Sequence, residues 1–338
     1  MFRAVDPIAS AESLCRARRI PRLSRARLVA AAQWLVTAVA LWLVVRSIDI
    51  GTVLDLIGRA ALPGLCLAGI VVAAQFVVLV WRWRLALRIM GGGSVGLGPL
   101  SVFLGRSFLI GQVLPSSVGV DVARTIMLAR VTGAATATRS VVCDRVFGFS
   151  ALSLLVAATL PVIAAKIGGT TPFLMLTIAA LGILAALALV LASPSIILTV
   201  PWLGKYLGTI ARELRLALWS GKVSLVAVTV SMGSNLFAVL LIFILGSAIG
   251  ADLRAIDCLV LVPAALLVSS LPISLGGWGV REGALVAAFS LVQADPAGVA
   301  ATSVMFGLTT PLAGAAFAAA SLLGGWRNVL PKGSHDGG

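Results

Sequence analysis

The chain has 338 residues, of which 60% are hydrophobic and 11% are charged. Soluble globular proteins carry about 25% charged residues, so the composition excludes a soluble protein and predicts an all-α polytopic membrane protein. The formal net charge of +14 does not indicate nucleic-acid binding, because the basic residues lie in the N-terminal segment and between apolar runs, where they fix the orientation of a membrane protein.

The chain begins with a basic segment, residues 1–27, which contains seven arginines and which we expect to be a cytoplasmic tail. A membrane-spanning helix needs about 20 apolar residues, and six segments fit that requirement within a transmembrane domain over residues 28–325. The predicted spans are 28–45, 62–81, 141–165, 173–192, 223–249 and 299–323. Residues 326–338 are predicted to be a polar C-terminal tail.

Two further apolar regions, 100–130 and 256–293, are each interrupted near the middle by a Leu-Pro…Gly motif. The halves of each region are marginal or too short to cross a bilayer. We therefore predict two broken, re-entrant helical hairpins, each of which enters and leaves on one side. Two full crossings per region would also return the chain to the same side, so connectivity leaves that alternative open.

The charges of the loops predict the orientation. Segments 82–88 and 193–222 are net basic and suit the cytoplasm, whereas segment 46–61 has no net charge and suits the outside. Both termini are then cytoplasmic. Each half, about 28–165 and about 173–323, has an odd number of net crossings, so we expect two inverted repeats whose hairpins meet near the middle of the membrane.

The two interruptions are copies of one motif. Residues 114–124, LPSSVGVDVAR, align without gaps on residues 271–281, LPISLGGWGVR, at a constant offset of 157 positions. Each copy places a helix breaker shortly before a charge within apolar sequence. Paired interruptions of this kind in the two halves of a chain indicate the binding site of a transporter.

Several charged residues are predicted to lie inside the membrane, where each costs roughly 2.5 kcal/mol or more on insertion scales and is a functional candidate. They are Arg106, Asp121, Arg124, Asp144, Arg145, Arg281 and Glu282. Asp121 and Arg124 are three residues apart, which makes them neighbours on a helix. The adjacent members of the pairs 144–145 and 281–282 point in different directions, so each is expected to find a partner elsewhere.

These charges have two interpretations. In the first, they form an internal network of ion pairs that holds the helices together. In the second, Arg124 and Arg281, assisted by Arg106 and Arg145, bind an anion, because a guanidinium holds phosphate or carboxylate with two hydrogen bonds and stays charged when buried. Helix N-termini at the motifs would add amide donors. The motif residues that complete the predicted substrate site are Gly119, Gly276, Gly277, Gly279, Pro115, Pro272, Ser117 and Ser274.

The sequence offers little for catalysis or metal binding. The four cysteines are far apart, and the single histidine, His335, lies in the polar tail. No nucleotide-binding, nucleophile or metalloprotease motif is present. We therefore expect no enzyme activity, no cofactor and no metal, with the cysteines acting as small apolar residues.

At these charges and motifs the chain resembles a known family, the transmembrane domain of lysylphosphatidylglycerol synthase/flippase and its stand-alone relatives. The resemblance covers most of residues 28–325, and its most specific part is the Gly-Gly-x-Gly-x-Arg-Glu run at residues 276–282. Its other matching stretches are 111–115, 121–124 and 144–145. The first motif departs from the family's Gly-Gly-Asp, because Val120 stands in place of the second glycine.

The resemblance implies a flippase of the bacterial inner membrane that moves a lipid between leaflets. Its partner would be the lipid bilayer and, within it, an anionic phospholipid or a modified, for example aminoacylated, lipid headgroup. About 15 residues follow the last predicted span, so we expect lipid transport without a synthase domain. Arg124 and Arg281 would engage the lipid phosphate, and Asp121 and Glu282 would orient them or contact a cationic headgroup.

Two other functions are open at this point. One is a small-solute or ion-coupled transporter on the same scaffold. The other is a non-catalytic membrane partner of a lipid-modifying or glycosyltransferase enzyme. In either case the first motif copy carries its acid before the arginine, at Asp121, and the second after it, at Glu282, so we expect one asymmetric site between the halves.

Overall fold

The computed structural model describes residues 34–40, 42–43, 46, 50–93, 95–113, 119–167, 221–270 and 277–323. Every regular element in these ranges is a helix, which confirms the predicted all-α fold. The predicted span 173–192 and both predicted tails lie outside the described residues, and the predicted span 28–45 is described only in part.

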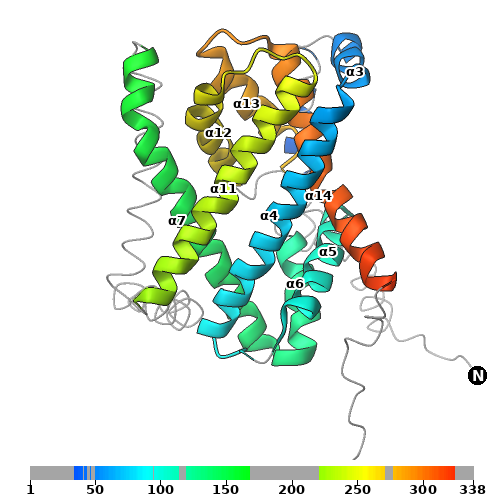
Figure 1. The fold of residues 1–338 in the computed structure, drawn as a ribbon, viewed down its shortest axis with the longest axis vertical. Helices are drawn as coiled ribbons and strands as arrows, with labels where there is room; N and C mark the ends of the chain where they lie inside the picture. The colour runs from blue at the N-terminus through cyan, green and yellow to red at the C-terminus, as the bar shows by residue number, and fades with distance from the viewer. Residues whose placement is uncertain are drawn as a thin grey trace, which may run out of the picture.

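Four of the described helices are long and apolar enough to cross a membrane. They are α4 (Leu62–Ile89), α7 (Ala134–Ile167), α11 (Lys222–Ala248) and α14 (Pro296–Leu323), and a short helix α3 (Ile50–Gly58) precedes α4. They correspond to four of the six predicted spans, so the chain is a multi-pass membrane protein. In Figure 1, α4 and α11 run through the middle of the bundle, while α7 and α14 flank them.

Helix α4 is longer than the sequence predicts. The apolar run ends at residue 81, which predicts a cytoplasmic loop for the arginines that follow. In the structure the helix continues to Ile89 and buries Trp83 and residues 85–87. Because these apolar side chains anchor the last turns, Arg82 is carried into the protein interior. The predicted loop is therefore wrong at this residue.

Four shorter helices form two pairs. They are α5 (Leu97–Val113), α6 (Gly119–Thr132), α12 (Ala255–Ser269) and α13 (Val280–Ser290). None reaches the roughly 20 residues that a span requires. Figure 1 shows α5 and α6 together at one end of the bundle and α12 and α13 at the opposite end. This arrangement agrees with two re-entrant hairpins in inverted halves; their turns, residues 114–118 and 271–276, lie outside the described residues.

Glycines allow the helices to approach closely. A Cβ atom on Gly314 of α14 would lie 2.8 Å from the carbonyl oxygen of Gly105 in α5. A Cβ atom on Gly64 of α4 would lie 2.6 Å from the Cβ of Ala248 in α11. Both contacts are shorter than van der Waals packing allows, so these helix crossings require glycine, as is common where membrane helices pack.

Apolar clusters attach each hairpin to the long helices. One cluster joins α4 to α5 and α6 through Trp83, Phe103 and Leu128. Another joins α11 to α13 through Ile242 and Phe289. Because all five side chains are buried, the hairpins are fixed against the bundle, and the charges at their ends are held in defined positions.

Candidate functional site

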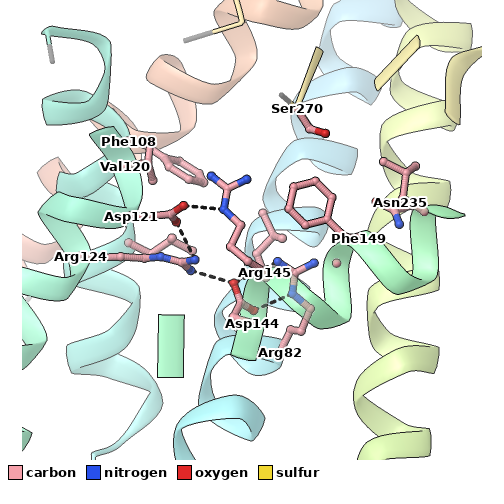
Figure 2. Close-up of a pocket in the computed structure, with 14 residues that line it drawn as sticks. Arg82, Phe108, Val120, Asp121, Arg124, Asp144, Arg145, Phe149, Asn235 and Ser270 are labelled. Atoms are coloured by element: carbon pink, nitrogen blue, oxygen red, sulfur yellow. Dashed lines mark hydrogen bonds and ion pairs between the residues drawn. The ribbon is translucent and has the colours of Figure 1, made fainter. Parts of the chain in front are cut away.

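Five charged side chains from three helices form one network of ion pairs, which we call the α6–α7 ion cluster (Figure 2). They are Arg82 of α4, Asp121 and Arg124 of α6, and Asp144 and Arg145 of α7. Four of them are predicted site residues. Arg82 is the one member that the sequence did not predict as a site residue. The signal that could have revealed it is the apolar residues on both sides, which continue the helix.

Asp144 is the centre of the cluster and is 1% exposed. Its Oδ1 lies 2.7 Å from Nε of Arg82, and its Oδ2 lies 3.1 Å from Nη2 of the same arginine. Nη1 of Arg124 donates a further hydrogen bond to Oδ2 over 2.9 Å. Two charge-assisted partners therefore hold this carboxylate in the interior, where an unpaired charge would be strongly unfavourable.

Asp121 forms the second link. Its Oδ1 lies 2.7 Å from Nη2 of Arg124, which is the predicted neighbour at three residues along the helix. Its Oδ2 accepts a hydrogen bond from Nε of Arg145. Asp144 and Arg145 thus find different partners, as their adjacency predicts, and Arg124 bridges the two aspartates.

The ion cluster has one positive charge in excess, since three arginines meet two aspartates. Arg145 is its accessible member: its side chain is 38% exposed, against 12% for Arg82 and 6% for Arg124. Figure 2 shows the terminal nitrogens of Arg145 directed away from Asp121 and toward Ser270. They form no hydrogen bond with any residue in the described part of the chain.

The ion cluster lines a cavity of about 220 Å³, to which all five of its residues contribute. Its other lining residues include Asn235 of α11, Ser270 at the end of α12, Phe108 and Phe149. The amide nitrogen of Asn235 is buried and has no hydrogen-bond partner among the described residues. The charges of this polar cavity therefore come from the first half, and the second half supplies uncharged polar groups.

A larger cavity of about 530 Å³ adjoins the polar one and is lined by residues of α6 and α7. The lining residues shared by the two cavities are Asp121, Arg145, Phe149 and Ser270. The other lining residues are mainly apolar, and we call this space the apolar groove. Val122 and Ile126 on its rim are 46% and 55% exposed. The apolar groove therefore includes apolar side chains that are exposed on the surface of the protein.

Arg281 and Glu282 form a separate buried ion pair where α13 packs on α14, and neither residue lines the polar cavity or the apolar groove. Nη2 of Arg281 lies 2.5 Å from Oε1 of Glu282, and the Ser303 hydroxyl donates a hydrogen bond to the same oxygen over 3.3 Å. The amide of Gly279 donates to Oε2 over 2.6 Å, and the Trp278 ring centroid lies 4.7 Å from the guanidinium carbon. The prediction that these two adjacent charges find partners elsewhere is wrong.

The family model described as "Lysylphosphatidylglycerol synthase TM region" matches residues 29–318. The chain belongs to this family. The matched range contains both cavities, the α6–α7 ion cluster and the Arg281–Glu282 pair, and it confirms the resemblance identified from the sequence. Comparison with curated proteins gives no match.

In this member of the lysylphosphatidylglycerol synthase TM region family, neither cavity is lined by the predicted site residues Arg106, Gly119, Gly277 and Gly279. Arg106 on α5 is partly buried and has no ion pair or hydrogen bond within the described ranges. Gly119 is buried at the start of α6. Gly277 and Gly279 have φ angles of 82° and 80°, a conformation that favours glycine, and they form the turn before α13. The predicted residues outside the described ranges are Pro115, Ser117, Pro272, Ser274 and Gly276.

One further residue of this family member explains how the Arg281–Glu282 pair fits between its helices. A Cβ atom on Gly307 of α14 would overlap the guanidinium of Arg281. Glycine at this position therefore creates the space that the arginine fills. No local pattern in the sequence marks this role of Gly307, because its partner lies on another helix.

Proposed function

We propose that this protein moves a phospholipid between the leaflets of the bacterial inner membrane, with both termini in the cytoplasm. The observation that carries the proposal is the junction of the polar cavity with the apolar groove. A lipid has a charged headgroup and apolar chains, and it needs both environments side by side. The family assignment supports the same conclusion, because the family is that of a lipid enzyme's membrane region.

The apolar groove favours a lipid over a small soluble solute. A water-soluble substrate needs a polar path to the aqueous phase, whereas the groove rim is formed by Val122 and Ile126. Acyl chains would lie between α6 and α7 while the headgroup reaches the polar cavity from the side. Burying each CH₂ group of a chain contributes about 0.8 kcal/mol, so the groove contributes affinity and the charges contribute specificity.

We further propose that the chain transports without chemical reaction. A general base needs a carboxylate that is free to accept a proton from the substrate. Asp121 and Asp144 are each held by two arginines, so neither is available. Their role would be to position the guanidinium groups around the headgroup.

The proposal is tested by transport in proteoliposomes. A fluorescent phospholipid placed in both leaflets is bleached from outside, and the additional bleaching that the protein causes measures translocation. We expect Arg124→Ala to reduce this rate at least tenfold, because the two aspartates lose the side chain that joins them. The fold should survive, since Asp144 retains Arg82 and Asp121 retains Arg145.

The matched control is Arg88→Ala. Arg88 is exposed near the end of α4 and lines neither cavity, so the variant removes the same charge outside the site and should translocate lipid at the wild-type rate. Equal rates for wild type and a folded Arg124→Ala protein would contradict the proposed site. A wild-type protein that never accelerates bleaching would contradict lipid translocation itself.

A further inference from the structure

We propose that the polar cavity selects lipids whose headgroup has a net negative charge, and that Arg145 contacts the headgroup phosphate. This inference rests on the proposed function, because it assigns a substrate class to the same site. It differs from the expectation that Asp121 receives a cationic headgroup. The hydrogen-bonding groups of the cavity that are still unoccupied decide which headgroup it can bind.

The acidic groups of the cavity are occupied. Each of the four carboxylate oxygens of Asp121 and Asp144 lies within 3.1 Å of an arginine nitrogen. Even where a carboxylate oxygen keeps a free lone pair, an ammonium group that entered the cavity would be repelled by the excess positive charge of the three guanidinium groups. The charge balance of the cavity therefore disfavours a cationic headgroup.

The cavity also contains donors that have no partner. The terminal nitrogens of Arg145 form no hydrogen bond within the described part of the chain, and the buried amide nitrogen of Asn235 has no partner there. The Ser270 hydroxyl donates its hydrogen to the carbonyl of Leu267 over 2.6 Å, so its oxygen can only accept. A guanidinium and an amide that converge on one small cavity form a site for an anion.

The adjoining segments do not alter this charge count. Residues 114–118 and 271–276, which precede α6 and follow Ser270 in the chain, contain no acidic or basic side chain. The cluster thus retains one excess positive charge, which a phosphodiester with an uncharged headgroup neutralises. The volume of about 220 Å³ is below the roughly 300–1,000 Å³ of pockets for drug-sized ligands, so it suits a small headgroup.

The test is competitive lipid binding to the full-length protein in detergent. Delipidated protein receives equal amounts of phosphatidylglycerol, phosphatidylethanolamine and lysylphosphatidylglycerol, which are anionic, zwitterionic and cationic, and mass spectrometry measures the lipid that co-purifies. We expect phosphatidylglycerol to exceed each of the others at least tenfold. Arg145→Gln should reduce this preference to less than threefold, whereas Arg145→Lys, which keeps the charge, should retain a larger part of it.

Two further variants control for charge and folding. Arg88→Gln removes a positive charge outside both cavities and should keep the full preference. Asn235→Ala removes an uncharged free donor and leaves every ion pair in place, so it should weaken the preference even if Arg145→Gln fails to fold. A thermal unfolding curve identifies the variants that remain folded.

Three results would overturn the inference: equal retention of lysylphosphatidylglycerol or phosphatidylethanolamine by wild type, an unchanged preference in folded Arg145→Gln, or displacement of bound lipid by low millimolar inorganic phosphate. The last would identify a free anion as the ligand. The proposed function would fail by a different result. If the protein binds phosphatidylglycerol selectively but does not translocate it, the headgroup selectivity stands and the proposed transport is wrong.

Discussion

Each copy of the motif contributes its arginine to a buried cluster of charges, and the two clusters are built in different ways. The α6–α7 ion cluster joins α4, α6 and α7, has an excess positive charge and lines a cavity. The Arg281–Glu282 pair is neutral, joins α13 to α14 through Ser303 and lines neither the polar cavity nor the apolar groove.

The position of the acid accounts for this difference. In the second half Glu282 follows Arg281 directly and neutralises it locally, so the arginine does not need a charged partner across the helix interface. In the first half Arg124 shares Asp121 with Arg145 and shares Asp144 with Arg82, and the chain of pairs ends at the exposed guanidinium of Arg145. The second copy of the motif therefore places Arg281 in a neutral pair between packed helices. The first copy belongs to a cluster with an excess positive charge, whose exposed hydrogen-bond donor is Arg145.

The largest effect should come from breaking the neutral pair. Glu282→Ala leaves Arg281 buried without a counter-charge, which typically costs about 3–5 kcal/mol, and it also removes the acceptor for the amide of Gly279. We expect a large loss of folded protein, measured by thermal unfolding in detergent. Asp55→Ala is the matched control, since it breaks the exposed Arg59–Asp55 pair and should cost less than about 1 kcal/mol. Similar effects for the two variants would contradict a structural role for Glu282.

A smaller effect should follow from filling the space beside that pair. Gly307→Ala places a methyl group against the guanidinium of Arg281, and overpacking of this kind costs typically about 1–3 kcal/mol. Gly233→Ala is the control, because no atom lies within 4 Å of its added Cβ and alanine is the better helix former by roughly 0.5–1 kcal/mol. The prediction is that the melting temperature falls for the first variant and is unchanged or higher for the second.

The smallest effect on stability, with a clear effect on transport, is expected in the apolar groove. Ile126→Trp places a larger side chain on the exposed rim, where the change in unfolding free energy should stay within about 0.5 kcal/mol. Lipid translocation should nevertheless fall severalfold, because the acyl chains lose space. Val77→Trp makes a comparable change at a position 60% exposed on α4, outside both cavities. Equal transport by the two tryptophan variants would show that the groove is not the acyl-chain site.

Much of the fold could be predicted because hydropathy and helix breakers are local signals. Composition gave the class, and the Leu-Pro…Gly motifs marked the short helices on both sides of each interruption. The spacing of Asp121 and Arg124 predicted their ion pair, since residues three apart on a helix are neighbours. The separate partners of Asp144 and Arg145 followed from their adjacency.

What the sequence did not predict depends on tertiary contacts or on side-chain flexibility. Arg82 was assigned to a loop because hydropathy ends a span at the first charge, whereas packing of Trp83 extends the helix. Arg281 can fold back onto its neighbour because its side chain is long and flexible, so adjacency did not separate the two charges. Asn235 and Ser270 reach the polar cavity only through the packing of the second half on the first, which no local pattern records.

The claim that lipid occupies the first-half site is tested most directly by photo-crosslinking in liposomes. Phosphatidylglycerol with a photoreactive group near the end of one acyl chain is incorporated with the full-length protein, irradiated, and the adducts are mapped by mass spectrometry. We expect adducts concentrated on residues 122–149, which include the walls of the apolar groove, and a marked loss of these adducts in Ile126→Trp but not in Val77→Trp. Adducts spread evenly over the exposed surface, or concentrated on α13 and α14, would contradict it.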